Sequence, residues 1–292
     1  CNYHNNIAII DFTKCSTVNI SGSEFRNNPS GRIEALLLIQ DCSATITDSI
    51  FDGNISHEGG AILIRGAKVA INDCEFINNT ARYSSDYHNV TAFGGAINFN
   101  YGGTFTLGGR VTIRGNKTVL TPDAFVSHKS GSTTYPPREK TAPTGGGIFV
   151  GTSGKLVIKQ GTLLVIKDNT RQILDADGNE TASYQDNLYI EGSKNVLMGD
   201  LDRGSEVGIN CASAGDELDA ILSVGESYPV TNDLLSVFSA DNTSYGLRFV
   251  SISDGSNFKN GLIFYKKVRS DYWVIVNDNS VSYDPKTAQT VG

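Results

Sequence analysis

A short pattern recurs four times in the first eighty residues and constrains the fold more than any other feature. Each copy reads small residue, any residue, aromatic, two residues of any kind and Asn, and the copies begin at Cys1, Ser23, Ser49 and Cys74. Their starts are 22, 26 and 25 residues apart. A period near 25 residues is the size of one solenoid coil and is too short for a propeller blade.

Each unit also contains short runs of alternating polarity, which are typical of strands. One run precedes each later copy, and a second run, often opened by paired glycines, follows at residues 59–64, 94–99 and 145–150. About three short strands per unit predict a parallel β-helix whose coils stack ~4.8 Å apart. In such a stack the aromatic residue fills the interior at a corner. The Asn three residues later tolerates a left-handed backbone and can form hydrogen bonds to the chain around the turn. The paired glycines are expected to supply positive φ and close approach of the coils.

The composition restricts the class of partner. The chain has 292 residues, with 24 Lys and Arg against 31 Asp and Glu, and therefore a formal charge of −7. Nucleic-acid binding requires clustered basic residues, which the sequence lacks, so we expect no nucleic-acid partner. The longest apolar runs, such as residues 35–39, are far shorter than the roughly 20 residues that cross a bilayer, so we expect no membrane insertion of this segment.

The two motifs together resemble the repeat of polymorphic outer-membrane proteins, whose hallmarks are Phe-x-x-Asn and Gly-Gly-Ala followed by an aliphatic residue. The first motif occurs at Phe25, Phe51 and Phe76; the second occurs at Gly59 and Gly94, and at Gly145 with Gly147 in place of Ala. Residues 168–170, 186–190 and 207–209 are more loosely similar to the closing coils of β-helical surface proteins of Gram-positive bacteria. The resemblance implies a bacterial surface adhesin or stalk, secreted or displayed at the cell surface, with a role in host interaction and virulence. It identifies no ligand.

We therefore expect an all-β fold with two regions. Residues 1–210 are predicted to form a right-handed parallel β-helix of about 25-residue coils, and residues 211–292 a C-terminal β-rich cap or a small all-β appendage. Cys1 occupies the position of Cys74 in the unit, so the chain is expected to begin in mid-coil; a lipid-modified Cys1 is the competing interpretation. The segment is expected to be a monomeric part of a larger surface protein.

Long insertions between the Asn and the paired glycines are the best candidates for function. They should leave the coils on one side, and they grow from four residues after Asn54 to fourteen after Asn79 and twenty-eight after Asn116. Loops on a rigid scaffold often carry binding residues, and Tyr, Arg and His are favoured contact residues. We predict a surface that binds a host or neighbouring-cell protein or glycan through Arg82, Tyr83, Asp86, Tyr87, His88, His128, Tyr135, Arg138 and Tyr184. The alternative is that these insertions are tolerated surface excursions on a spacer with no ligand.

Metal and cofactor sites receive little support from the sequence. No His has a His or Cys at zinc-ligand spacing, so solvated or turn-bonded imidazoles are expected, and no cofactor is predicted. Asp175, Asp177 and Asn179 form a weak calcium candidate, but the segment lacks the Gly and Glu of a calcium loop and an Asx turn accounts for the same residues.

A carbohydrate-active β-helix enzyme, either a polysaccharide lyase or a glycoside hydrolase, is the alternative function. Glycoside hydrolysis requires two carboxylates that flank one bond, and the sequence contains no Asp-Asp, Asn-Thr-Asp or Gly-His-Gly motif. A lyase would need a basic residue beside a carboxylate cluster, and we interpret Arg65 and Lys68 as solvated single charges. We therefore predict no catalytic residues and no enzyme.

The five cysteines cannot all pair with one another. Cys1 and Cys74 are about three coils apart, beyond the reach of a disulfide. Cys15 and Cys42 are one coil apart at nearly the same place in the unit, so a bridge between them is sterically conceivable. Buried, reduced thiols are the favoured interpretation, which leaves the pairing of Cys15 and Cys42 open.

Overall fold

A computed structural model describes residues 2–4, 10–29, 35–83, 92–130, 132–135, 144–191, 196–198, 201–211, 222–224, 236–254, 257–266, 275–277 and 280–282. Strands dominate this part of the chain, which also contains the short 3-10 helix η1 (Pro122–Phe125). No helix among these residues is long and apolar enough to span a bilayer. The predicted all-β class is therefore confirmed.

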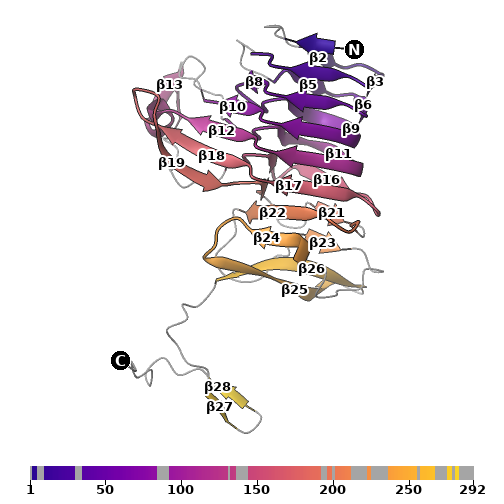
Figure 1. Cartoon of the computed structure of the whole chain (residues 1–292), viewed down its shortest axis with the longest axis vertical. Coiled ribbons are helices and arrows are strands. Elements are labelled where there is room, and N and C mark those ends of the chain that lie inside the picture. Colours follow the sequence, from indigo (N-terminus) through magenta and orange to yellow (C-terminus); the bar gives the residue numbers. More distant parts are fainter. Residues whose placement is uncertain are drawn as a thin grey trace.

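Equivalent strands of successive units pair in parallel and stack along the long axis of the molecule (Figure 1). The stacked strands form three walls. The first wall contains β2 (Ile10–Thr13), β5 (Leu37–Gln40), the starts of β9 (Ile62–Ile77) and β11 (Ile97–Arg114), β15 (Ile148–Val150) and β20 (Leu188–Ile190). The second contains β3 (Thr17–Ser21), β6 (Ser43–Thr47), the middles of β9 and β11, β16 (Gly154–Ile158), β21 (Val196–Met198) and β23 (Leu222–Val224). The third contains β1 (Asn2–His4), β4 (Glu24–Arg26), β7 (Ile50–Asp52), the ends of β9 and β11, β17 (Leu163–Lys167) and β22 (Glu206–Cys211).

The register of these walls places like residues over like residues, as expected for a parallel β-solenoid. In the first wall one column of aliphatic side chains runs through Leu37, Ile62, Ile97, Ile148 and Leu188. Within the strands of the third wall, Phe25 stacks on Phe51 and Phe51 on Phe76, each with ring centroids 4.7 Å apart and planes within 5°. All three rings are at most 4% exposed. The predicted interior position of the motif aromatic is therefore confirmed.

A second sheet lies beside the three walls, on the left in Figure 1. We call it the side sheet; its strand order is β19 (Glu180–Gln185), β18 (Thr170–Leu174), β12 (Lys117–Leu120), β10 (Thr80–Arg82) and β8 (Ile55–Ser56). All neighbours in it pair in parallel except β18 and β19. The units that contain β8, β10, β12 and β18 thus add a fourth strand where the sequence indicated three strands and a loop.

Parallel pairing continues past residue 211 before the pattern changes. β24 (Phe238–Ala240) pairs in parallel with β22, and β23 pairs in parallel with β21. β23 then pairs antiparallel with β26 (Asn257–Lys266), which forms a hairpin with β25 (Tyr245–Asp254). A separate hairpin joins β27 (Ile275–Asn277) and β28 (Ser280–Ser282).

The turn chemistry of the repeat agrees with the sequence in the glycines and differs in the asparagine. The first glycine of each pair has positive φ, at 74° in Gly59, 62° in Gly94 and 65° in Gly145. The left-handed residue of the Phe-x-x-Asn turn, however, is the one before the Asn, with φ of 53° at Asn27 and 56° at Asn78. Our assignment of the left-handed backbone to the motif Asn was wrong, because that Asn is used for a buried side-chain network instead.

Candidate interaction surface

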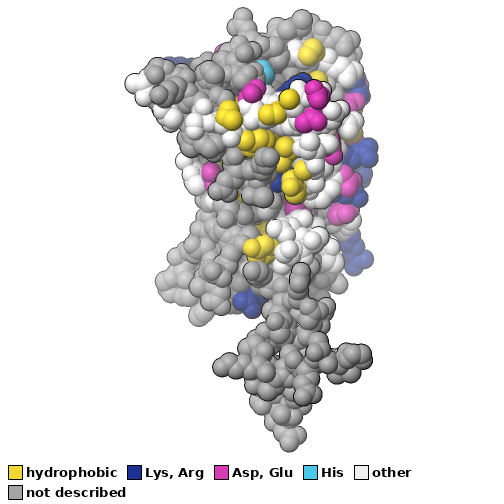
Figure 2. Space-filling model, turned by 90° about the vertical axis from the view of Figure 1, so that its left-hand side faces the viewer, with side chains coloured by type: hydrophobic (Ala, Val, Ile, Leu, Met, Phe, Trp, Pro, Cys, Tyr) yellow, Lys and Arg dark blue, Asp and Glu magenta, His cyan; other side chains and the backbone are white. Residues whose placement is uncertain are grey.

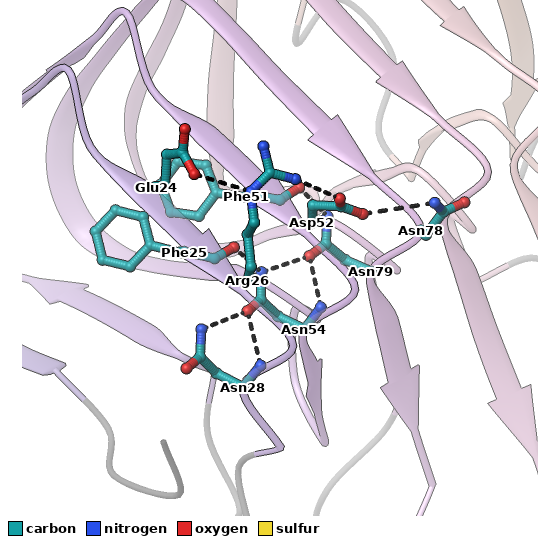
Figure 3. A network of polar contacts seen from close by, with 9 residues as sticks. All are labelled: Glu24, Phe25, Arg26, Asn28, Phe51, Asp52, Asn54, Asn78 and Asn79. Atoms are coloured by element: carbon teal, nitrogen blue, oxygen red, sulfur yellow. Dashed lines mark hydrogen bonds and ion pairs between the residues drawn. The ribbon is translucent and has the colours of Figure 1, made fainter. Parts of the chain in front are cut away.

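The side sheet grows out of a row of buried asparagines, which we call the asparagine ladder. Its members are fully or almost fully buried and comprise Asn28, Asn54, Asn79, Asn116, Asn169 and Asn187. The Nδ2 of Asn54 donates to the Oδ1 of Asn79 at 2.8 Å (Figure 3). Asn79 donates in the same way to Asn116 at 2.9 Å. The backbone N–H of Asn54 donates to the same Oδ1 of Asn79 at 3.1 Å. Each oxygen therefore accepts two hydrogen bonds from the coil before it.

The second N–H of each ladder amide fixes the neighbouring corner. The Nδ2 of Asn54 donates to the carbonyl of Phe25 at 3.0 Å, and the Nδ2 of Asn79 donates to the carbonyl of Phe51 at 2.9 Å. Four ladder residues directly precede β8, β10, β12 and β18. Because buried polar groups are costly to leave unpaired, this network fixes where every parallel strand of the side sheet begins.

The ladder ends on a carboxylate. The Nδ2 and backbone N–H of Asn187 donate to Oδ1 and Oδ2 of Asp241, each at 2.6 Å. Burial raises the pKa of Asp241 to about 6, although the bonds from Asn187 oppose the shift and the charge of Asp186 adds to it. A Cβ at Gly208 would lie 2.3 Å from the amide of Asn187. β22 passes through Gly208 directly from its pairing with β17 to its pairing with β20, so this coil adds no strand to the side sheet there.

The long insertions leave from the ends of the side-sheet strands. β10 ends at Arg82, β12 is followed by η1, and β18 turns back into β19. A small apolar cluster of Ala81, Tyr83, Ala92, Leu120 and Ala124 packs the bases of the first two insertions together, with Phe125 against it. Figure 2 faces this side of the molecule and shows hydrophobic side chains gathered on it. The described ends of the insertions therefore lie on one side, as the sequence predicts.

Three predicted contact residues have described side chains. Arg82 is exposed at the end of β10, and its carbonyl lies 2.8 Å from the Nδ1 of His57. Tyr184 is 44% exposed on β19. Tyr83 is only 6% exposed and belongs to the apolar cluster. Tyr83 thus packs the base of an insertion, whereas Arg82 and Tyr184 are available for contact.

The other predicted contact residues are placed less completely. His128 and Tyr135 face each other in the backbone register of a hairpin formed by β13 (His128–Ser130) and β14 (Thr133–Tyr135). Asp86, Tyr87, His88 and Arg138 lie outside the described residues.

A buried charged group supports the exposed ring of Tyr184. The Cζ of Arg171 lies 4.5 Å from the centroid of that ring, and Arg171 is 4% exposed. Burial lowers the pKa of Arg171, while the nearby charge of Asp186 acts in the opposite direction. The Asp186 carboxylate accepts the N–H groups of Thr144 at 2.7 Å and Gly145 at 2.8 Å. Burial raises the pKa of Asp186. The exposed ring of Tyr184 therefore rests on the buried side chain of Arg171.

A second arginine beside an exposed tyrosine ring was not predicted from the sequence. Arg65 forms an ion pair with Glu58 at 2.9 Å and lies with its Cζ 4.7 Å from the centroid of the Tyr101 ring. Glu58 is 3% exposed and Tyr101 is 47% exposed. The interpretation of Arg65 as a solvated single charge was wrong, because a carboxylate seven residues earlier in the chain folds back onto it. The spacing of Glu58 and Arg65 around the paired glycines was the available signal.

The calcium candidate has the contacts of an Asx turn. The Oδ1 of Asp175 accepts the backbone N–H of Asp177 at 3.0 Å and of Asn179 at 2.8 Å, and these bonds lower the pKa of Asp175. Among the described residues, no group of three or more His, Cys, Asp or Glu side chains could hold a metal ion. Calcium binding by Asp175, Asp177 and Asn179 stays a prediction.

Comparison with protein-family models, curated proteins and solved structures finds no match to this chain.

Proposed function

We propose that this chain is a non-enzymatic, rigid stalk segment of a bacterial surface protein, and that the side-sheet face binds a protein or glycan on a host or neighbouring cell. The fold proposed with it is a right-handed β-helix whose C-terminal residues, from about 211, form a cap or small appendage. The observation that carries the proposal is the asparagine ladder, because it aligns successive side strands and hence the insertions that follow them. A surface fixed in advance loses little conformational entropy on binding.

Two exposed positions of this surface have the chemistry of a contact site. Tyr184 is stacked on buried Arg171, and Arg82 projects from the end of β10. A supported tyrosine ring offers a flat apolar face with little rotamer freedom to lose, which suits sugar rings and protein side chains alike. The buried carboxylate of Asp186 and the partly buried carboxylate of Asp241 both accept backbone N–H groups. This use of the two carboxylates supports a structural role over glycosidic acid and base chemistry.

The test is binding of the purified chain to host cells and to a glycan and host-protein array. In the variants, residues 84–91 or 126–143 are replaced at equal length by Gly and Ser, which retains Tyr83, Ala92 and Ala124. The point variants are Arg82→Ala and Tyr184→Ala. Lys68→Ala and Lys155→Ala, on the exposed face of the second wall, serve as matched controls.

We expect the two loop replacements, Arg82→Ala and Tyr184→Ala each to lose at least about tenfold in affinity, which is typical of one hot-spot contact. The Lys68→Ala and Lys155→Ala controls should bind as the parent does. Equal binding by all variants would overturn the side-sheet face as the contact surface, and no binding by the parent chain would support a spacer without a ligand. Release of shortened oligosaccharides from a bound glycan would instead support the lyase or hydrolase alternative.

A further inference from the structure

Two cysteines of adjacent coils lie at the same corner of the solenoid, between the first and second walls. The flanking residues pair in register, Thr13 with Gln40 and Thr17 with Ser43. The residue before each cysteine has a left-handed backbone, with φ of 56° at Lys14 and 51° at Asp41. Cys15 and Cys42 therefore occupy the same corner of neighbouring coils, where the coil of Cys15 has three residues between the paired positions and the coil of Cys42 has two. Parallel neighbours stand about 4.8 Å apart, which lies within the 4.4–6.8 Å separation of Cα atoms that a disulfide spans.

Both cysteines pack with the core, and the thiol of Cys42 points toward the coil of Cys15. Cys42 is buried in the main core cluster, and the half-buried Cys15 packs against that cluster. The Sγ of Cys42 donates to the carbonyl of Phe12 at 3.4 Å, so this thiol points toward the coil that holds Cys15. The Sγ of Cys15 donates weakly to the carbonyl of Thr13 at 3.8 Å. Both thiols are free in this structure.

The third described thiol provides an internal contrast. Cys74 is 1% exposed and is paired in register with Val111 of the next coil. Its Sγ donates to the carbonyl of Asn72 at 3.1 Å. Burial raises the pKa of Cys74 to about 11. The thiolate form of Cys74 is therefore strongly disfavoured, and its register partner Val111 has no sulfur with which a disulfide could form.

We propose that Cys15 and Cys42 form an oxidisable pair that closes to a disulfide and clips the first two coils together. The oxidant is a low-molecular-weight disulfide. The more exposed Cys15, as thiolate, attacks one sulfur of the oxidant and releases one thiolate. Cys42, after losing its proton to solvent, attacks the Cys15 sulfur and releases the second thiolate. Two electrons pass from the two cysteines to the oxidant. The sulfur–sulfur bond of the oxidant breaks, and a sulfur–sulfur bond between Cys15 and Cys42 forms.

The location of Cys15 and Cys42 determines how a disulfide between them would affect the solenoid. β2 pairs in parallel with β5 and β3 with β6, so paired strands flank the two cysteines on both sides. Local opening of either coil breaks these pairings. A covalent link between Cys15 and Cys42 restricts that opening. This inference does not depend on the proposed function, since it concerns the stability of the scaffold and not its ligand.

The full chain is incubated with mixtures of reduced and oxidised glutathione at pH 8, alkylated and digested with trypsin without reduction. We expect mass spectrometry to find the peptide that begins at Cys15 linked to the peptide that contains Cys42. Cys74 should be alkylated at every ratio. Cys74→Ser is expected to retain the link, and Cys15→Ser and Cys42→Ser to abolish it.

A second measurement tests the clip. Oxidation of the parent chain should raise its Tm by several degrees and slow amide hydrogen exchange in β2 and β3, and Cys15→Ser should show neither change. A stable glutathione adduct on Cys15 beside a free Cys42 would overturn the proposal, as would preferential linkage of either residue to Cys1 or Cys211. A link without any change in Tm or exchange would overturn the stabilising role.

Discussion

At the scale of single residues, the ladder depends on a property that only a carboxamide has. Each ladder Asn accepts two hydrogen bonds through its oxygen and donates two through its nitrogen. Asn79 accepts from the backbone and side chain of Asn54 and donates to Asn116 and to the carbonyl of Phe51. Neither a carboxylate nor an aliphatic side chain can provide both functions inside a stack.

We expect Asn79→Ala to be strongly destabilising. The change removes four buried hydrogen bonds of Asn79. The backbone N–H and one Nδ2 proton of Asn54 lose their shared acceptor, and the carbonyl of Phe51 loses one donor. The expected loss is about 2–4 kcal/mol in the free energy of unfolding, measured by urea denaturation. Asn78→Gly is the control, because Asn78 is exposed and a glycine accepts its φ of 56°. Equal stability of the two variants would show that the ladder contributes little.

The contact between Asn187 and Asp241 at the end of the asparagine ladder should make the stability of the protein depend on pH. The pKa of Asp241 is raised to about 6 in the folded protein, so between its unfolded value near 4 and 6 the folded state holds a proton that the unfolded state has lost. The contribution of Asp241 to stability therefore falls as pH rises through this window. Asp241→Asn keeps an oxygen for Asn187 and removes the titration.

Denaturation of both proteins at several pH values between 4 and 8 measures this effect. We expect Asp241→Asn to gain on the parent by on the order of 1 kcal/mol between pH 4 and pH 7.5, after allowance for the partial exposure of this residue. Comparing the difference between the two proteins cancels the titration of groups other than Asp241 that the substitution leaves undisturbed. A constant difference across the range would contradict the raised pKa.

The sequence predicted residue roles where size and polarity decide them. The Phe at the corner is predictable because a large apolar ring in a repeat has to be inside, and Phe25, Phe51 and Phe76 are stacked there. The ladder was not foreseen, because Asn is common in turns and its usual reason for being there is backbone conformation. The Asn side chains form a buried network only because the coils stack and place each Asn beside the next.

At the scale of elements, the paired glycines bring the first wall against the side sheet. The second glycine of each pair has no room for a side chain. A Cβ at Gly95 would lie 1.9 Å from the carbonyl oxygen of Gly146 and 2.6 Å from the nitrogen of Lys117. These atoms belong to the backbone of neighbouring strands and turns, so they cannot move aside without breaking the pairing.

Gly95→Ala is therefore expected to lower the free energy of unfolding by more than about 3 kcal/mol or to prevent folding. Gly161→Ala is the matched control, since Gly161 has a φ of 73° and a Cβ there meets nothing within 4 Å. It should cost only about 1–2 kcal/mol through backbone strain. Soluble yield and thermal unfolding distinguish the two, and similar losses would mean that close approach is not the reason for the second glycine.

The side sheet marks the limit of prediction for elements. Three strands per unit were visible as alternating runs, but β8 and β10 contain two and three residues. Such segments are too short to show a period. They become strands because the residue before each is a ladder Asn whose position is fixed by the neighbouring coil. The insertions consequently begin later than the sequence suggested, after Arg82 and Leu120 instead of after Asn79 and Asn116.

At the scale of the whole molecule, the order of the coils is fixed by pairs distant in sequence. β15 pairs with β20, β16 with β21 and β17 with β22, across segments of some forty residues. The repeat predicts this order, since equivalent units can bury their apolar faces only against one another. The point where the side sheet ends was not predictable, because it depends on Asn187 and Asp241 meeting Gly208.

Because interstrand bonds and not chain connectivity hold the stack, a cut in the exposed turn between β18 and β19 should leave it intact. A specific protease site inserted after Ala176 divides the chain where both halves retain their pairing, including Thr170 with Gln185 and Ile148 with Leu188. We expect the cleaved protein to elute as one species of unchanged mass and to separate in guanidinium. Its Tm should become dependent on concentration, since unfolding then releases two chains. Separation of the halves in native buffer at micromolar concentration would show that the coils on either side of the turn fold as independent units, contrary to a continuous stack.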